Sequence, residues 1–323
     1  MNSRDPARDD SARKRDNSAR KRDDSTDRAQ SLIGFGEALL AFGFWGVFPI
    51  YVVQLVGLPI GEVLAHRVLW SAVTAAAILA SRRQLRGLVV ALANPRLFLV
   101  TAVNAALLTV NWLVFLHANF NSAVLEISLG YYSMPLVMSF LGFLFAREKI
   151  SAPEIVALAV SALGVGALAV SEGRLPWISI SLATTFAVYG MIHKRIVHRP
   201  LEGLCSEMLV ALPLALAWIL ALHLSDTANF AQPGHARDSW FIFGLGITSI
   251  APLVFFHRAA RKLRYITLGF MSYIGPSVQF VLAITFFAEP FTPVRFFTFA
   301  CIWIALAIFS YGNLRHSAHP LPR

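Results

Sequence analysis

The chain has 323 residues, of which 56% are hydrophobic and only 14% are charged. A soluble protein carries about a quarter charged residues, so this composition excludes an ordinary soluble domain. The net charge of +10 comes from Lys and Arg residues dispersed over the breaks between apolar runs, which disfavours nucleic-acid binding.

Residues 1–31 form a polar tail with nine basic and seven acidic residues. The segment Ser11-Ala-Arg-Lys-Arg-Asp16 recurs as Ser18-Ala-Arg-Lys-Arg-Asp23, without an apolar stripe. High charge with almost no apolar content predicts disorder. We interpret the tail as a solvated cytoplasmic segment, with contact to anionic lipid as the alternative.

Ten apolar segments follow, and each approaches the roughly 20 residues that a membrane-spanning helix needs. Lipid offers no hydrogen-bond partners to the backbone, and the segments show no strand-like alternation. We therefore predict an all-α integral membrane fold with ten transmembrane helices and a short polar end at 315–323. The predicted spans lie near 34–56, 62–81, 97–117, 122–146, 153–171, 175–193, 203–224, 239–257, 265–288 and 294–314.

The Lys and Arg residues between the spans predict the orientation. With the N-terminus in the cytoplasm, the inside segments hold 24 of these residues and the outside breaks hold three, Arg174, Arg237 and Arg295. Cytoplasmic loops of membrane proteins are enriched in Lys and Arg. We therefore place both termini in the cytoplasm of a multi-pass protein of the cell (inner or plasma) membrane.

The last five spans repeat the first five. Leu113-Val-Phe-Leu-His117 recurs as Leu253-Val-Phe-Phe-His257, and Ile127-Ser-Leu-Gly130 recurs as Ile266-Thr-Leu-Gly269. Tyr132, Pro135 and Glu148 recur at the same spacing as Tyr273, Pro276 and Glu289. Because five is an odd number, the second copy enters the membrane from the opposite side. This predicts inverted repeats at 32–172 and 173–314, an arrangement found in many secondary transporters.

Ionisable residues within spans are hypotheses for function by default. Arg67 and Glu126 lie at similar predicted depths below the outer surface, so we expect them to pair. The pair is either a structural lock or a gate or proton-linked pair. His117 and His257 match under the repeat but lie at span ends, where packing is favoured over a metal site because no further ligands accompany them.

Polar and aromatic residues gather at mid-membrane positions of several spans. Prolines there free backbone carbonyls that protein, water or ligand must satisfy. Any one of these side chains could be plain interhelical packing, but together they favour a central substrate cavity where the repeats meet. The residues predicted to line it are Trp45, Asn104, Asn111, Trp112, Tyr132, Pro135, Tyr189, Tyr273, Pro276 and Gln279.

Catalytic motifs are missing from the sequence. There is no Gly-x4-Gly-Lys-Ser/Thr phosphate loop, no His-Glu-x-x-His and no Gly-x-Ser-x-Gly. The two cysteines, Cys205 and Cys301, both fall in predicted spans and imply no disulfide framework. We expect no enzyme activity, no cofactor and no metal.

Several local motifs resemble one known family. Glu62-Val-Leu-Ala-His-Arg-Val-Leu-Trp-Ser71, Asn111-Trp112, Leu125-Glu-Ile-Ser-Leu-Gly-Tyr131 and Leu268-Gly-Phe-x-x-Tyr-Ile-Gly-Pro276 are similar to the RarD branch of the drug/metabolite transporter (EamA) superfamily. The resemblance covers roughly 32–314. It implies ten helices in two inverted repeats, cytoplasmic termini and transport of small metabolites or drugs. Met134, Arg147 and Ser272 depart from the family pattern.

We therefore predict a secondary transporter, or permease, that works by alternating access, with proton coupling as an open option. Its partners would be a small-molecule substrate and the lipid bilayer, and the pattern is compatible with any oligomeric state. The alternatives are a channel-like pore and a membrane scaffold or enzyme without a visible catalytic motif.

Overall fold

The computed structural model describes residues 30–146, 151–196, 200–263 and 271–318, and no described residue lies in a β-strand. A first helix, 30–52, leads into the short 3-10 helix η1 (Val53–Leu55). The other helices are α2 (Ile60–Ser81), α3 (Arg86–Ala93), α4 (Pro95–Phe120), α5 (Val124–Ala146), α6 (Ala152–Glu172), α7 (Trp177–Ile196), α8 (Pro200–Leu224), α9 (Ala236–Ala260), α11 (Ile274–Thr285) and α12 (Pro293–Ala318).

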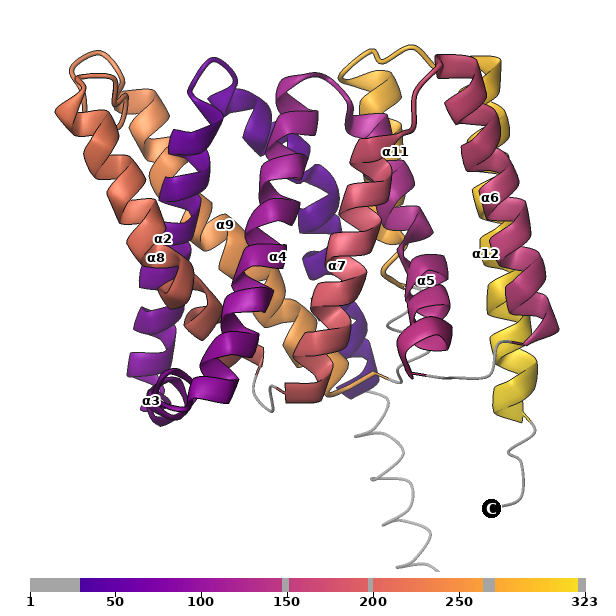
Figure 1. Cartoon of the computed structure of the whole chain (residues 1–323), viewed down its shortest axis with the longest axis horizontal. Helices are drawn as coiled ribbons and strands as arrows, with labels where there is room; N and C mark the ends of the chain where they lie inside the picture. Colours follow the sequence, from indigo (N-terminus) through magenta and orange to yellow (C-terminus); the bar gives the residue numbers. More distant parts are fainter. Residues whose placement is uncertain (1–29, 147–150, 197–199, 264–270, 319–323) are drawn as a thin grey trace, which may run out of the picture.

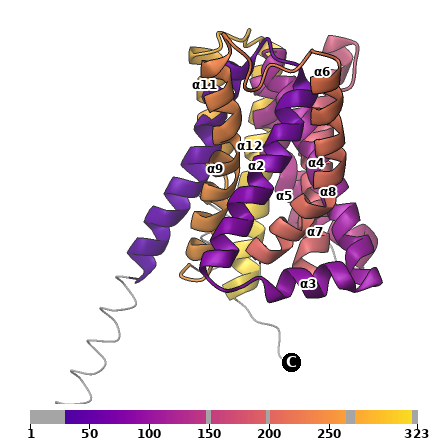
Figure 2. The ribbon, with the colours of Figure 1, turned by 90° about the vertical axis from the view of Figure 1, so that its left-hand side faces the viewer.

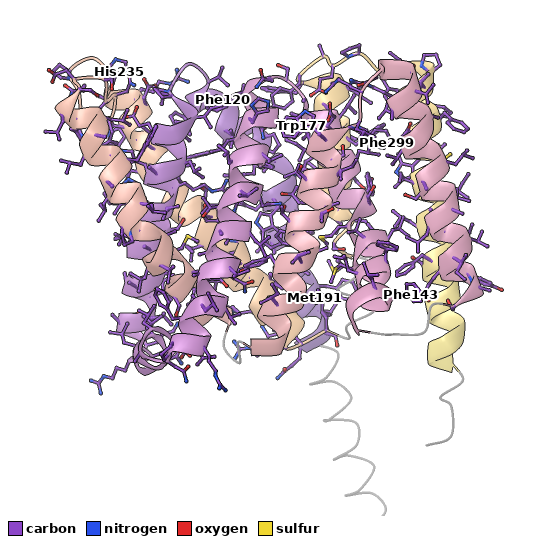
Figure 3. The ribbon with its side chains drawn as sticks, viewed as in Figure 1. Phe120, Phe143, Trp177, Met191, His235 and Phe299 are labelled. Carbon is purple, nitrogen blue, oxygen red and sulfur yellow. The ribbon has the colours of Figure 1, made fainter. Side chains whose placement is uncertain are left out.

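The long helices run side by side in one bundle (Figure 1). The turns from α4 to α5, from α6 to α7 and from α8 to α9 lie at the end drawn uppermost, which we call the upper end. His235, Phe120 and Trp177 lie towards this end, and Met191 and Phe143 lie towards the lower end (Figure 3). Successive helices therefore cross the bundle in alternating directions.

The short helix α3 was not predicted from the sequence. It follows the basic stretch after α2 and lies across the lower ends of the other helices (Figure 2). The next helix, α4, begins where Pro95 takes the first helical position and the Asn94 side chain accepts hydrogen bonds from the Arg96 and Leu97 amides. Proline is suited to this position because its missing N–H has no helical partner there.

Seven helices are long and apolar enough to cross a membrane, counting only the described residues. They begin with Gln30–Leu55 and include α2, α4 and α6 together with most of α8, α9 and α12. Shorter apolar stretches, Val124–Met138, Trp177–Ile192 and Ile274–Thr285, lie in α5, α7 and α11. Many large apolar side chains are exposed on the bundle, as lipid contact requires. The chain is thus an all-helical, multi-pass membrane protein.

Helices of the first half of the chain pack against helices of the second half. α2 contacts α8 and α9, α4 contacts α7 and α8, α5 contacts α7 and α11, and α6 contacts α12. Glycine permits some of the closest approaches: a Cβ atom at Gly130 of α5 would lie 2.9 Å from the Ser179 carbonyl oxygen of α7. Small residues at crossings are typical of membrane helices.

Several sequence predictions fall on residues that the structure does not describe. They concern most of the polar tail at 1–31, Arg147, Glu148, residues 265–270 of the ninth predicted span and the last part of 315–323.

Candidate functional site

The predicted cavity residues Tyr132 and Tyr273 lie together where α5 meets α11. Their rings stack with centroids 6.2 Å apart, and the Tyr132 hydroxyl lies 2.6 Å from the Ser277 hydroxyl. The Ser277 hydroxyl donates to the Tyr273 carbonyl at 2.7 Å, so the Tyr132 hydroxyl is the donor to Ser277. Tyr132 is buried. Two successive hydrogen bonds therefore link Tyr132 of α5, through the exposed Ser277, to the Tyr273 carbonyl at the start of α11.

Proline in the first helix explains the position of Gln279. Pro49 has no N–H, so the Trp45 carbonyl lacks its usual helical partner. The Gln279 amide donates to that carbonyl at 3.1 Å from α11, while its own Oε1 is buried without a partner. In the same region Ser128 of α5 donates to the Pro276 carbonyl at 2.8 Å. These bonds hold α11 between the first helix and α5.

A second group of predicted residues lies where α4 meets α7 and α8. Asn104 donates to Glu207 at 3.2 Å, and the Tyr189 hydroxyl donates to the other oxygen of the same carboxylate at 3.0 Å. Further along α4, Asn111 donates to Thr185 of α7 at 2.9 Å. The Asn104 Oδ1 atom is buried without a partner.

Residues of α5 connect the two groups. The Tyr131 hydroxyl donates to the Asn111 side-chain oxygen at 3.4 Å, whereas the neighbouring Tyr132 faces α11. The predicted cavity residues thus divide between two sides of α5 and do not form one cluster. Pro135 lies within α5 and is half-buried.

Arg67 of α2 is only 6% exposed and lies among aromatic residues. Its guanidinium carbon lies 4.0 Å from the ring centroid of Trp112 and 5.0 Å from that of Phe48. Its Nε donates to Ser249 of α9 at 3.1 Å, and its Nη1 is buried without a hydrogen-bond partner. Cation–π contact accounts for part of the stabilisation of this charge.

The predicted pairing of Arg67 with Glu126 is wrong. Glu126 instead binds Arg174, whose Nη2 lies 3.1 Å from Oε1 of Glu126. Similar depth gives the position of a residue along a helix, but the direction of its side chain around the helix decides its neighbours. Arg67 faces α4 and α9, and Glu126 faces the turn between α6 and α7.

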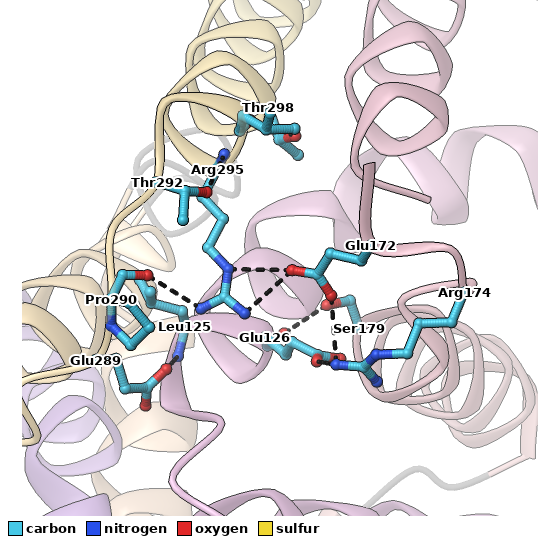
Figure 4. A network of polar contacts seen from close by, with 11 residues as sticks. Leu125, Glu126, Glu172, Arg174, Ser179, Glu289, Pro290, Thr292, Arg295 and Thr298 are labelled. Atoms are coloured by element: carbon cyan, nitrogen blue, oxygen red, sulfur yellow. Dashed lines mark hydrogen bonds and ion pairs between the residues drawn. The ribbon is translucent and has the colours of Figure 1, made fainter. Parts of the chain in front are cut away.

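Glu126 belongs to a polar network at the upper end (Figure 4). Arg174 also contacts Glu172 at 3.3 Å, and Glu172 receives two hydrogen bonds from Arg295 of α12 at 3.1 and 3.2 Å. Beside them, Glu289 accepts hydrogen bonds from the Val124 and Leu125 amides and so caps α5. The network ties α5 and α6 to α12. A small cavity next to it is lined by Leu125, Glu126, Leu129, Leu168, Glu172, Arg295, Thr298 and Phe299.

A separate ion cluster joins helices at the lower end. Glu37 of the first helix lies 2.7 Å from both Arg258 and Lys262, which are on α9 or directly follow it. Carboxylate–cation contacts therefore link the first and second halves of the chain at both ends of the bundle.

Sequence reasoning missed the partners in these clusters. It treated Arg174 and Arg295 only as rare basic residues outside the membrane, and it did not consider Glu172, Thr185 or Ser249. The partners of Arg174 and Arg295 could have been sought from the sequence. Lys and Arg are rare in the outside breaks, and a basic residue there suggests a specific acidic partner.

His117 was predicted to pack at a span end and not to bind a metal. The His117 ring lies 5.4 Å from the Trp177 ring, a packing contact between α4 and α7. Within the described ranges, no group of three or more His, Cys, Asp or Glu side chains is placed to hold a metal.

The chain is similar over most of its length to several bacterial proteins, although no family model matches it. It is 37% identical to "Protein RarD" of Escherichia coli over 272 residues, which cover 84% of this chain and 92% of that protein. It is 38% identical to "Protein RarD" of Streptomyces exfoliatus, covering 88% and 89%. It is 37% identical to an "Uncharacterized transporter" of Vibrio cholerae, covering 86% and 92%.

One solved structure, described as "Crystal structure of protein", has a related fold. The TM-score is 0.52 at 18% sequence identity, covering 89% of this chain and 98% of that one. At this identity the likeness concerns the fold alone.

Proposed function

Because this chain belongs to the RarD branch of the drug/metabolite transporter (EamA) superfamily, we propose that it is a secondary transporter that moves small metabolites or drugs by alternating access. The observation that carries the proposal is the relationship to transporters over nearly the whole chain. The buried, partly unsatisfied polar atoms of Gln279 and Asn104 supply groups that a substrate could contact.

The helix pairings support two inverted five-helix halves. If the halves repeat, α2 corresponds to α8, α4 to α9 and α5 to α11. The contact of α2 with α9 then corresponds to that of α8 with α4, and the contacts α2–α8, α5–α11 and α6–α12 join corresponding helices. A pseudo-two-fold axis relating the halves would produce this set of pairs.

The contacts at the two ends suggest the gates. In the proposed orientation the Glu126–Arg174–Glu172–Arg295 network faces outside, and the Glu37 cluster faces the cytoplasm. Opening either end requires separating carboxylates from cations that join the two halves. Alternating access then consists of opening these contacts one end at a time around a midplane site.

Counterflow in proteoliposomes tests the proposal. Proteoliposomes that contain the purified protein are loaded in turn with unlabelled amino acids, amines or chloramphenicol. They should then accumulate the same labelled solute from outside, transiently and saturably. A channel-like pore would give conductance that does not saturate, and an enzyme would release a changed product. Repeating the assay with an imposed pH gradient tests proton coupling. If no solute of the panel shows saturable counterflow, the result counts against the proposal for these solute classes.

The tyrosines at the α5–α11 contact provide a sharper test. Tyr132→Phe removes the donor to Ser277 and should impair transport, because the lost hydrogen bond between α5 and α11 contributes about 0.5–1.5 kcal/mol. Tyr273→Phe should also impair transport. Protein levels should be nearly unchanged, and Tyr311→Phe, at an exposed position of α12, is the matched control. Normal transport by both variants would make these tyrosines packing residues.

A further inference from the structure

We propose that the Arg67 guanidinium is the binding site for a carboxylate group of the transported solute, with the aromatic wall beside it receiving the solute's apolar part. This inference rests on the proposed function, because it assigns a substrate class, small organic carboxylates, to that transporter. It begins from the unused hydrogen-bonding capacity of Arg67.

An arginine side chain carries five N–H donors and stays charged in proteins. In this structure Nε of Arg67 is bound to Ser249, and Nη1 is buried without a partner. A ring face attracts the charge but does not accept these N–H groups in the way that an oxygen does. The guanidinium therefore has donors directed at no acceptor within a 6% exposed side chain.

No acidic side chain of the described residues forms an ion pair with Arg67. Glu62, one turn earlier on α2, accepts hydrogen bonds from the Asn229 and Phe230 amides of the α8–α9 loop. Glu126 is engaged by Arg174. An unpaired charge inside a membrane protein is costly, and such residues mark substrate and ion pathways. The missing negative charge is the one that an anionic solute would bring.

The position of Arg67 suits a transported solute. The residues around it come from α2, from the first helix through Phe48, from α4 through Trp112 and from α9 through Ser249. Three of these helices belong to the first half of the chain and one to the second. A group bound here would touch both halves, which alternating access requires.

The chemistry around Arg67 favours a monoanionic carboxylate. A guanidinium presents parallel donors that match the two oxygens of a carboxylate. The polar groups that act on it are uncharged hydroxyls: Ser249 accepts from Nε, and the Tyr131 phenol lies close enough to interact electrostatically, so the site offers a single positive charge. Trp112 and Phe48 line the guanidinium, and Phe115 stacks on Phe48 at 5.7 Å, which provides an aromatic surface for an apolar solute.

Matched pairs of acid and amide test this assignment on the purified full-length protein. Acetate and acetamide, benzoate and benzamide, and phenylacetate and phenylacetamide differ within each pair in charge and little in shape. We expect the carboxylates to raise the thermal unfolding midpoint above an equal ionic strength of sodium chloride, most for the aromatic acids. The amides should give no comparable shift.

Variants locate the effect. Arg67→Gln should weaken binding of the carboxylates by at least about tenfold, and Arg67→Lys should weaken it less, because lysine keeps the charge but loses the paired donors. Arg237→Gln is the matched control, because this exposed arginine also lies over an aromatic ring, Phe241, at 5.5 Å.

Binding should also change the tryptophan fluorescence of the wild type, and Trp112→Phe should remove that change.

Each outcome decides the proposal. If Arg67→Gln fails to fold, the wild-type discrimination between acid and amide together with Arg67→Lys still tests it. Equal shifts with acids and amides, no shift with any acid at millimolar concentration, or undiminished binding in Arg67→Gln would overturn it. If counterflow of neutral chloramphenicol is saturable while no carboxylate binds, the carboxylate site fails and the transporter proposal stands. If carboxylates bind but no solute shows counterflow, Arg67 is a carboxylate-binding site and the transporter proposal fails.

Discussion

At the scale of single residues, the polar network at the upper end depends on which carboxylate meets which arginine. Glu126 is 6% exposed in its side chain and Arg174 is 50% exposed. The pair therefore mixes a buried acid with a solvated base, and the exposed partner weakens the interaction. Double substitutions can distinguish the Glu126–Arg174 pair from the Glu126–Arg67 pair that similar depth suggested.

We predict that Glu126→Gln and Arg174→Gln are coupled in a double-mutant cycle. The expected coupling in unfolding free energy is about 0.5–1 kcal/mol, since the residues are in contact but one is half exposed. Unfolding of the purified protein in detergent, measured for the four variants, gives the value. The cycle of Glu126→Gln with Arg67→Gln should be additive, and coupling there instead would restore the pair that depth suggested.

Glu289 is expected to make stability depend on pH. Burial raises the pKa of this carboxyl above its ordinary value of 4.5, although the Leu125 and Val124 amides and Arg295 act in the opposite direction. The folded protein then holds the proton more tightly than the unfolded chain. Its contribution to stability is full at low pH and is lost as the pH rises through the raised pKa.

Glu289→Gln should remove this pH-dependent part and keep an oxygen that can accept from the α5 amides. The thermal unfolding midpoint of the wild type should therefore fall relative to that of the variant as the pH is raised from acidic to neutral. Parallel pH profiles for the two proteins would mean that another group titrates.

At the scale of helices, close approach is set by small residues. Gly164 of α6 faces α12, where a Cβ atom would lie 2.7 Å from the Cys301 Cβ and 3.2 Å from the Thr298 carbonyl oxygen. The Thr298 hydroxyl also donates to the Gly164 carbonyl at 3.0 Å. Gly166 lies on the same helix with no atom within 4 Å of its virtual Cβ.

These two glycines form a matched pair for substitution. Gly164→Ala should lower the unfolding midpoint, because the α6–α12 contact must separate, and such overpacking costs about 1–3 kcal/mol. Gly166→Ala should leave it unchanged or raise it slightly, because alanine favours the helix by up to about 1 kcal/mol relative to glycine. Equal effects of the two substitutions would show that the α6–α12 crossing tolerates more separation than its geometry indicates.

At the scale of the whole molecule, the basic residues predict which end faces the cytoplasm. The turns containing Ser122 and Thr227 lie at the upper end, and Gln84 lies between α2 and α3 at the lower end (Figures 1 and 2). In a background with the buried Cys205 and Cys301 replaced by alanine, cysteines at Ser122 and Thr227 should react with an impermeant thiol reagent added to intact cells.

The cysteine at Gln84 should react only after the cells are permeabilised. Permeabilised cells also provide the control that each introduced thiol is accessible. Reversed labelling at any one of the three positions would contradict the predicted orientation and the inverted repeat that depends on it.

The sequence alone determined the positions of several long helices, although it did not predict α3. The observed bounds of α2, α4, α6 and α8 agree with the predicted spans to within a few residues, because a segment in lipid must satisfy its own backbone and does so over about 20 apolar residues. The motifs also identified the family. The assignment of Asn111, Tyr132 and Gln279 to a substrate cavity stays a prediction, although all three side chains are buried.

Only the tertiary structure decided the partners of those residues. Gln279 satisfies the Trp45 carbonyl, Tyr132 binds Ser277, and Arg67 stacks on Trp112 instead of meeting Glu126. Sequence gives the depth of a side chain along its helix from the rise per residue. Which neighbour it meets depends on the rotation of that helix and on which helix is packed beside it, and both are set by the packing of the whole bundle.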